Sequence, residues 1–403
     1  MIHTTELAFL LFAVAILSTA FAYKTKKPYP IALVLVGLGI GLADFGFFPE
    51  LKHFFTEDQV FVTIVVSIFL PVLIGEAAFK LNFRELQEHK RPILALAGVG
   101  TLVTYGVVGL LGYYGLGLPL ELALLFGALM SATDPVSVLS IFKSLGVDKR
   151  LSVIMEGESL FNDGVAIVLF NLTLGLSAMA GAGVLGVAGM FVKVIAGGIA
   201  VGALVGLVLS TLTRFYDDYP LENAFVLTAF YGAYFGAEAF HVSGVIAVVV
   251  AGLIVGNYGA QVGMSQKTKD SVAVFLDTVT LIANAMVFIL VGLEVTREIL
   301  VLPWIVGAVL VVLIARAVAV YLVGGVAQVP ARWLHLLNWG GLKGSLSIAL
   351  ALTLPVGYAG RQEVLVMTFG VVLFSLVVQG LTVGGLVRKL GVTMEKGEES
   401  ESA

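Results

Sequence analysis

Apolar residues follow one another along this chain in runs near twenty residues long, separated by short polar segments. A run of that length crosses a bilayer as an α-helix, in which every spanning backbone group finds a partner within the segment. The pattern therefore predicts an all-α polytopic membrane protein of about thirteen spans. Their expected ranges are 5–23, 29–43, 59–79, 92–114, 120–142, 151–176, 185–213, 220–239, 242–258, 270–293, 303–325, 334–353 and 363–387.

Two of these spans carry a polar interruption. The fifth is broken at Thr133-Asp134-Pro135 and the twelfth at Gly340-Gly341-Leu342-Lys343-Gly344-Ser345. With the seventh span as a linker, the chain divides into two sets of six, and each break falls in the fifth span of its set. The two sets start on opposite sides of the membrane, which makes them inverted repeats. Interrupted helices at matching positions of inverted repeats indicate the binding site of a transporter.

Basic residues predict the orientation. With the N-terminus outside, only Lys52, Arg297 and Arg361 fall in outer loops, whereas most other Lys and Arg fall in inner loops. The first span has no basic residue before it, so we expect a retained span and not a secretory signal. This bias places the C-terminus, with a short polar tail over 391–403, in the cytoplasm.

Composition narrows the functional classes. Only 12% of residues are charged, against roughly 25% in soluble domains. The chain has no cysteine, which excludes disulfides, thiolate metal sites and cysteine nucleophiles. Its five histidines are scattered and do not form a zinc-binding pattern. No basic tract of the kind that binds nucleic acid is present. We expect a single membrane domain in the lipid bilayer, with no cofactor and no enzymatic activity.

The sharpest chemical signal lies in the sixth span, in the run Glu156-Gly157-Glu158-Ser159-Leu160-Phe161-Asn162-Asp163-Gly164. On a helix Glu158 and Asn162 share one stripe, while Ser159 and Asp163 share the next. Acids at membrane depth are costly and indicate function. A polar seam that packs helices is the alternative. Because one carboxylate holds either H⁺ or a small cation but hardly both, competition at Asp163 would yield exchange.

The break in the fifth span supplies further oxygen atoms. Pro135 opens the helix and frees carbonyl groups. These carbonyls, with the hydroxyl of Thr133 and the carboxylate of Asp134, would suit Na⁺ or Li⁺. A kinked helix in which Asp134 caps the break is the alternative, and we favour a mainly structural and electrostatic role for Asp134.

Three other charged residues within spans bear on the site. Arg316 needs a partner at membrane depth, and by depth Glu158 is the best candidate for a structural ion pair. Lys343, inside the second break, is expected to balance charge at the half-helix ends or near Asp134. Glu76 would either line a cytoplasmic funnel and reach the ion through water, or lie at the interface beside Lys80.

Four stretches together resemble the sodium/proton antiporters of the cation:proton antiporter superfamily, in the NhaP/NHE-type branch. They are Ala132-Thr133-Asp134-Pro135, the run from Glu156 to Gly164, Phe288-Ile289-Leu290-Val291-Gly292-Leu293-Glu294 and Gly340-Gly341-Leu342-Lys343-Gly344. The resemblance covers essentially the whole membrane domain.

The resemblance implies a homodimer, with scaffold helices over 1–91 and 177–300 and an elevator-like mobile core over 92–176 and 301–390. It implies that Asp163 carries the ion and the proton, that Ser159 and Thr133 bind the ion and that Asp134 lies close by. Asn162, where the electrogenic branch has a second Asp, implies electroneutral one-for-one exchange. Relatives commonly have Arg where Lys343 stands.

The expected function is exchange of Na⁺ or Li⁺ for H⁺ in a prokaryotic inner membrane, which would serve pH homeostasis. A K⁺/H⁺ antiporter of the same fold is the nearest alternative, since the motifs do not fix selectivity. A cation channel is disfavoured by the discontinuous helices. An intramembrane hydrolase would need paired catalytic acids, a base for Ser159 or a zinc site, whereas the acids of this chain fall in the pattern of an ion site.

Overall fold

The computed structural model describes residues 2–25, 28–42, 63–176, 183–216, 218–294, 302–355 and 357–392. Its described part is helical, as predicted. Every predicted span coincides with helix wherever it is described, and the ends agree to within about one turn. Seven described helices are long and apolar enough to cross a membrane. The number thirteen stays a prediction, and the tail from 393 onward lies outside the described residues.

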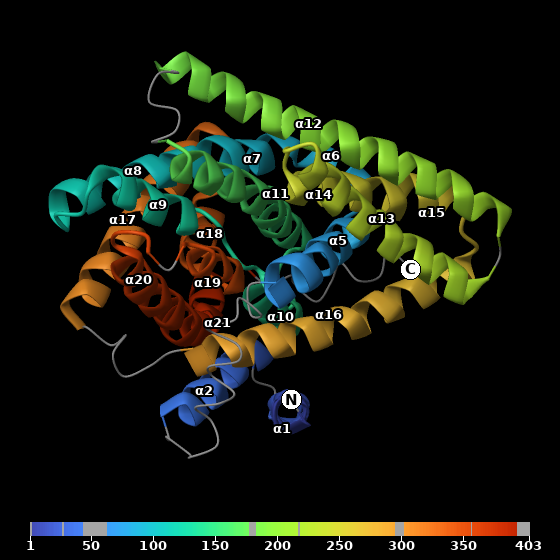
Figure 1. Ribbon diagram of the computed structural model, residues 1–403, viewed down its shortest axis with the longest axis horizontal. Helices are drawn as coiled ribbons and strands as arrows, with labels where there is room; N and C mark the ends of the chain where they lie inside the picture. The colour runs from blue at the N-terminus through green and yellow to red at the C-terminus, as the bar shows by residue number, and fades with distance from the viewer. Residues whose placement is uncertain are drawn as a thin grey trace.

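Long helices surround the interrupted ones (Figure 1). In this view α12 runs along the upper edge and α16 crosses the lower part above α1 and α2, while α17 to α21 gather with α8 and α9 on the left. Helices without internal breaks are α1 (Ile2–Lys24), α2 (Tyr29–Leu42), α11 (Lys149–Leu174), α12 (Gly183–Leu212), α13 (Tyr219–Ala239), α16 (Gln266–Glu294) and α17 (Leu302–Val326).

Four further spans contain a stretch of π-helix, in which the backbone is wider than in an α-helix. The sequence pattern did not predict these stretches, because they keep the same apolar character. They are η1–α5 (Thr63–Phe69, Leu70–Lys80), α7–η2–α8 (Lys90–Leu94, Ala95–Gly100, Thr101–Gly115), α14–η5–α15 (Gly244–Ile254, Val255–Gly259, Ala260–Val262) and α20–η7–α21 (Arg361–Phe374, Ser375–Gln379, Gly380–Leu390).

The two interrupted spans are split as the sequence predicts. The fifth consists of α9 (Leu120–Leu129) and α10 (Val136–Leu145), and the twelfth consists of α18 (Ala331–Gly340) and α19 (Ser345–Leu352). The loops add the short helices α6 (Phe83–Glu88) and η4 (Thr213–Phe215).

Small residues let the uninterrupted helices pack closely. Gly292 of α16 faces Gly37 of α2, and a Cβ atom on Gly292 would lie 2.9 Å from the Cα of Gly37. On the other side of the molecule, a Cβ atom on Gly252 of α14 would lie 2.9 Å from the carbonyl oxygen of Gly75 in α5. Small residues at helix crossings are typical of membrane proteins, where close backbone approach replaces the hydrophobic effect. These contacts fix α5 and α16, which carry charged residues described below.

Candidate ion-binding site

The two interrupted spans cross at their breaks. The first break covers residues 130–135 and the second covers 341–344. The backbone N–H of Asp134 donates to the carbonyl oxygen of Leu342 at 2.8 Å. A Cβ atom on Gly344 would lie 2.8 Å from the Cγ of Asp134, so a larger residue would displace the crossing. The two halves of the chain therefore meet in one joint.

Side chains form hydrogen bonds with backbone groups that the breaks leave without helical partners. The Asp134 carboxylate accepts the N–H of Val136 at 2.9 Å and so caps α10. The Lys343 ammonium donates to the carbonyl oxygen of Ala132 at 3.0 Å. The backbone N–H of Lys343 donates to the hydroxyl of Ser375, at the start of η7, at 2.9 Å. Asp134 thus satisfies a backbone N–H group at the first break, and Lys343 places a positive charge next to a carbonyl group of the same break.

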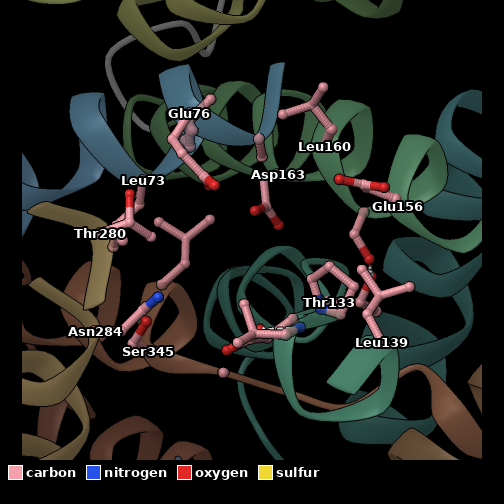
Figure 2. Close-up of a pocket in the computed structure, with 18 of the residues that line it drawn as sticks. Leu73, Glu76, Thr133, Leu139, Glu156, Leu160, Asp163, Thr280, Asn284 and Ser345 are labelled. Carbon is pink, nitrogen blue, oxygen red and sulfur yellow. Dashed lines mark hydrogen bonds between the residues drawn. The ribbon is translucent and has the colours of Figure 1, made fainter. Parts of the chain in front are cut away.

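Asp163 points from α11 into a cavity beside this joint (Figure 2). Its Oδ1 atom is buried and has no hydrogen-bond partner among the described residues. One turn earlier on α11, the Ser159 hydroxyl lies 2.8 Å from the hydroxyl of Thr133. Asp163, Ser159, Thr133 and Asp134 all line the cavity, which brings four of the predicted site residues together.

The cavity has a volume of about 740 Å³ and holds most of its charge as carboxylates. Such a volume admits a cation together with several water molecules, since a water occupies about 30 Å³ of liquid. The charged residues of its lining are Glu76, Asp134, Glu156, Asp163, Asp277, Lys80 and Lys143. Five acids against two lysines favour cations in the cavity over anions.

Glu158 lies on the other side of α11 and is fully paired. Its carboxylate accepts two hydrogen bonds from the Arg316 guanidinium, at 2.5 and 3.2 Å. Arg316 also donates to the carbonyl oxygen of Leu337 in α18, at 2.9 Å. Both Glu158 and Arg316 are buried. The pair joins α11 to α17, as depth along the spans suggested, and has no place in the cavity lining.

Asn162, which was grouped with the ion-binding residues in the prediction from sequence, is absent from the cavity lining. It is 1% exposed, and its amide donates to the hydroxyl of Thr133 at 2.7 Å. Its side-chain oxygen accepts the backbone N–H of Thr133 at 3.4 Å. Its stripe on α11 faces the first break and not the cavity, so Asn162 positions Thr133 beside the site.

Glu76 combines the two locations that the sequence left open. It lines the cavity, and its carboxylate also lies 2.5 Å from the ammonium of Lys80. The same ammonium contacts the carboxylate of Asp277 in α16. Glu76 therefore faces the cavity and pairs with Lys80 at the same time, because Lys80 also lines the cavity.

Sequence reasoning assigned no role to Glu156 and named Lys80 only as a neighbour of Glu76, although both line the cavity. Glu156 stands seven residues before Asp163, which is two helical turns and nearly the same face. That spacing is a signal in the sequence for Glu156. The spacing of four residues predicts the contact of Lys80 with Glu76, but no local signal predicts its contact with Asp277, which is far away along the chain.

Comparisons with known proteins identify the family of this chain. The family model for the transmembrane sodium/hydrogen exchanger matches residues 10–389. The Na⁺/H⁺ antiporter NhaG of Bacillus atrophaeus is 51% identical over 402 residues, covering 98% of this chain and 76% of that protein. NhaH of Halobacillus aidingensis, also a Na⁺/H⁺ antiporter, is 50% identical over 390 residues, covering 95% of this chain and 97% of that protein.

The fold also matches a solved structure. The sodium proton antiporter MjNhaP1 from Methanocaldococcus jannaschii aligns with a TM-score of 0.79 at 22% identity, covering 96% of this chain and 98% of that one. The resemblance inferred from four motifs is thereby confirmed over nearly the whole chain. This integral membrane protein belongs to the sodium/hydrogen exchanger family.

Proposed function

We propose that this protein exchanges Na⁺ or Li⁺ for H⁺ across the membrane, with both ions competing for Asp163. The observation that carries the proposal is the buried carboxylate oxygen of Asp163, which has no hydrogen-bond partner among the described residues and faces an acid-lined cavity. A buried polar atom without a partner is costly, and either a proton or a cation would satisfy it. The antiporter names of the two bacterial relatives support the same assignment.

The ligands proposed for the cation are Asp163, Ser159 and Thr133. Hydroxyl, carbonyl and carboxylate oxygens suit small hard cations. Asn162 would hold Thr133 in place, and Asp134 would cap α10 and add negative charge near the site. The nearest rival ion is K⁺, which the same oxygen atoms would also bind.

The charge arrangement supports electroneutral one-for-one exchange. Glu158 is neutralised by Arg316, and Asp134 is engaged in capping a helix. Asn162 carries no charge. Asp163 is then the one carboxylate at the joint that is free to change partner, so each crossing would carry one Na⁺ or one H⁺ on the same group.

Alternating access would follow from movement of the core, 92–176 and 301–390, past the scaffold, 1–91 and 177–300. Asp163 and both breaks belong to the core, while Glu76, Lys80 and Asp277 belong to the scaffold. The two sets of residues meet in the cavity lining. We further propose a homodimer in a prokaryotic inner membrane, with the N-terminus outside, the C-terminus in the cytoplasm and a role in pH homeostasis.

Proteoliposomes would test this function. A pH-sensitive dye is recorded on addition of Na⁺, Li⁺ or K⁺, with and without a clamped voltage, for wild type and Asp163→Asn. We expect a response to Na⁺ or Li⁺ that ignores voltage and vanishes in Asp163→Asn. A response to K⁺ alone would identify K⁺ as the transported cation in place of Na⁺ or Li⁺. A voltage-dependent response would contradict electroneutrality. Currents far above transporter turnover rates would indicate a channel.

A further inference from the structure

The open side of the cavity carries a charge arrangement that the exchange mechanism has not used. Lys80 bridges two carboxylates from different helices, Glu76 of α5 at 2.5 Å and Asp277 of α16. The Asp277 side chain is 63% exposed, that of Lys80 33% and that of Glu76 14%. Exposure therefore falls from Asp277 through Lys80 to Glu76, and all three residues line the cavity that Asp163 also lines. A cation that enters this cavity comes into the field of these three charges.

The bridge is held in place by the packing around it. Lys80 follows Glu76 by four residues on α5, so the two lie on one face of that helix. The helix itself is fixed against α14, where a Cβ atom on Gly252 would lie 2.7 Å from the Cβ of Ala78. Because Asp277 comes from α16, the ammonium joins two scaffold helices across the cavity mouth.

Glu156 faces the same space without a partner. It lines the cavity from α11, on the Asp163 face of that helix, and makes no hydrogen bond or ion pair with the residues that the structure describes. Lys143 also lines the cavity and forms no ion pair in the described part of the chain. Of the two lysines in the cavity lining, Lys80 is therefore the one that contacts carboxylates, namely Glu76 and Asp277 at the mouth of the cavity.

We propose that Lys80 determines the apparent affinity for the transported cation, as a tethered positive charge that competes with Na⁺ for the acids of the cavity mouth. This inference rests on the proposed function. With the ammonium in place, Glu76, Asp277 and Lys80 together carry one net negative charge in place of two, and they attract Na⁺ less strongly. Without it, the two acids and Glu156 would draw Na⁺ as their counter-ion and raise its concentration next to Asp163.

The effect has a direction and a side. Lys80 sits on the scaffold and contacts the cavity from its open side, so it acts on ions that enter from that side, which the basic residues predict to be the cytoplasm. Lys80→Gln should lower the KM for Na⁺ from that side about three- to tenfold at low ionic strength. The KM from the opposite side should stay unchanged, because there the core would face away from Lys80. The difference should shrink at high salt, where charges separated by about 10 Å are screened.

The experiment measures Na⁺-driven proton transport in vesicles of both orientations, at 20 and 300 mM choline chloride. We expect Lys80→Gln to lower KM on one side with a turnover number within twofold of wild type. Lys80→Arg, which keeps the charge, should restore the wild-type KM. Lys143→Gln removes the same charge from the same lining without a carboxylate contact, and its KM should stay within twofold. Asp277→Asn should raise the KM.

Binding without transport separates this inference from the function on which it rests. The Na⁺ concentration that gives half of the thermal stabilisation in detergent is recorded for wild type, Lys80→Gln and Asp163→Asn. If wild type binds Na⁺ and does not transport it, the proposed function fails, while a lowered midpoint in Lys80→Gln would still support the role of Lys80. An unchanged midpoint and KM in Lys80→Gln, or an equal effect of Lys143→Gln, would overturn it.

Discussion

Two faces of α11 carry carboxylates in opposite surroundings. Glu158 is buried against Arg316 and satisfied by two hydrogen bonds, whereas Asp163, five residues later, has one oxygen that accepts no hydrogen bond from the described part of the chain and lies beside a cavity. The first carboxylate is neutralised by a protein cation, whereas the second forms no ion pair with the residues that the structure describes. The comparison shows that burial of an acid in a membrane span does not by itself define an ion site. What distinguishes the two is whether the protein supplies the partner.

The largest contrast is expected in transport. Asp163→Asn keeps the shape of the side chain and removes its charge, so exchange should fall at least about 100-fold. The melting temperature should stay the same or rise, because an amide is less costly to bury than an unpaired acid. Proton transport in proteoliposomes and thermal melting in detergent would be measured on the same preparation. Retained exchange would remove the distinction between the two acids.

Loss of the Glu158–Arg316 ion pair should lower the stability of the protein. Arg316→Leu leaves the Glu158 carboxylate buried and alone, which typically costs about 3–5 kcal/mol. We expect the melting temperature to fall by about 5 °C or more. The control is the double replacement Glu158→Leu with Arg316→Leu, which removes both charges and should recover most of the loss. A stable Arg316→Leu protein with a shifted pH profile would instead place Glu158 in the mechanism.

Asn162 contacts the proposed site only indirectly, through Thr133. Asn162→Ala removes the hydrogen bond to the Thr133 hydroxyl, worth about 1 kcal/mol, so the KM for Na⁺ should rise about fivefold. Turnover should change less than KM, because Asp163 is untouched. An unchanged KM would show that Thr133 keeps its place without Asn162.

The same position sharpens the argument about stoichiometry. Asn162→Asp adds a carboxylate beside Asp163, and exchange that becomes voltage-dependent would support electroneutrality by a single acid. The measurement is transport with and without a clamped potential. A voltage-insensitive variant would count against the argument.

The smallest effect is expected at the beginning of α11, outside the membrane span. The Asp148 carboxylate accepts the backbone N–H of Arg150 at 2.9 Å and contacts its guanidinium, and these bonds hold the pKa of Asp148 below its usual value. A lowered folded-state pKa contributes stability above about pH 4 that is lost as pH falls through the folded value. Asp148→Ala should therefore cost about 1 kcal/mol at pH 7 and progressively less below pH 4. Asp148→Ser, which still caps the helix, is the control for melting measured against pH.

Much of the fold followed from the sequence. Apolar runs near twenty residues long, broken at Pro135 and at Gly340-Gly341, predicted the helices and both interruptions, since the bilayer allows few other forms. The polar run from Glu158 to Asp163 predicted the helix that borders the cavity and pointed to Asp163 as the acid of the proposed site, because an acid at membrane depth is rarely kept without use.

The tertiary structure decided which partner each polar group finds. Helical spacing placed Glu158 and Asn162 on one stripe, but only packing shows that one meets Arg316 and the other Thr133. The bridge from Lys80 to Asp277 joins residues 197 positions apart, and no local pattern predicts such a contact. Local sequence fixes periodicity and helix ends, whereas the pairing of charges depends on which helices lie side by side.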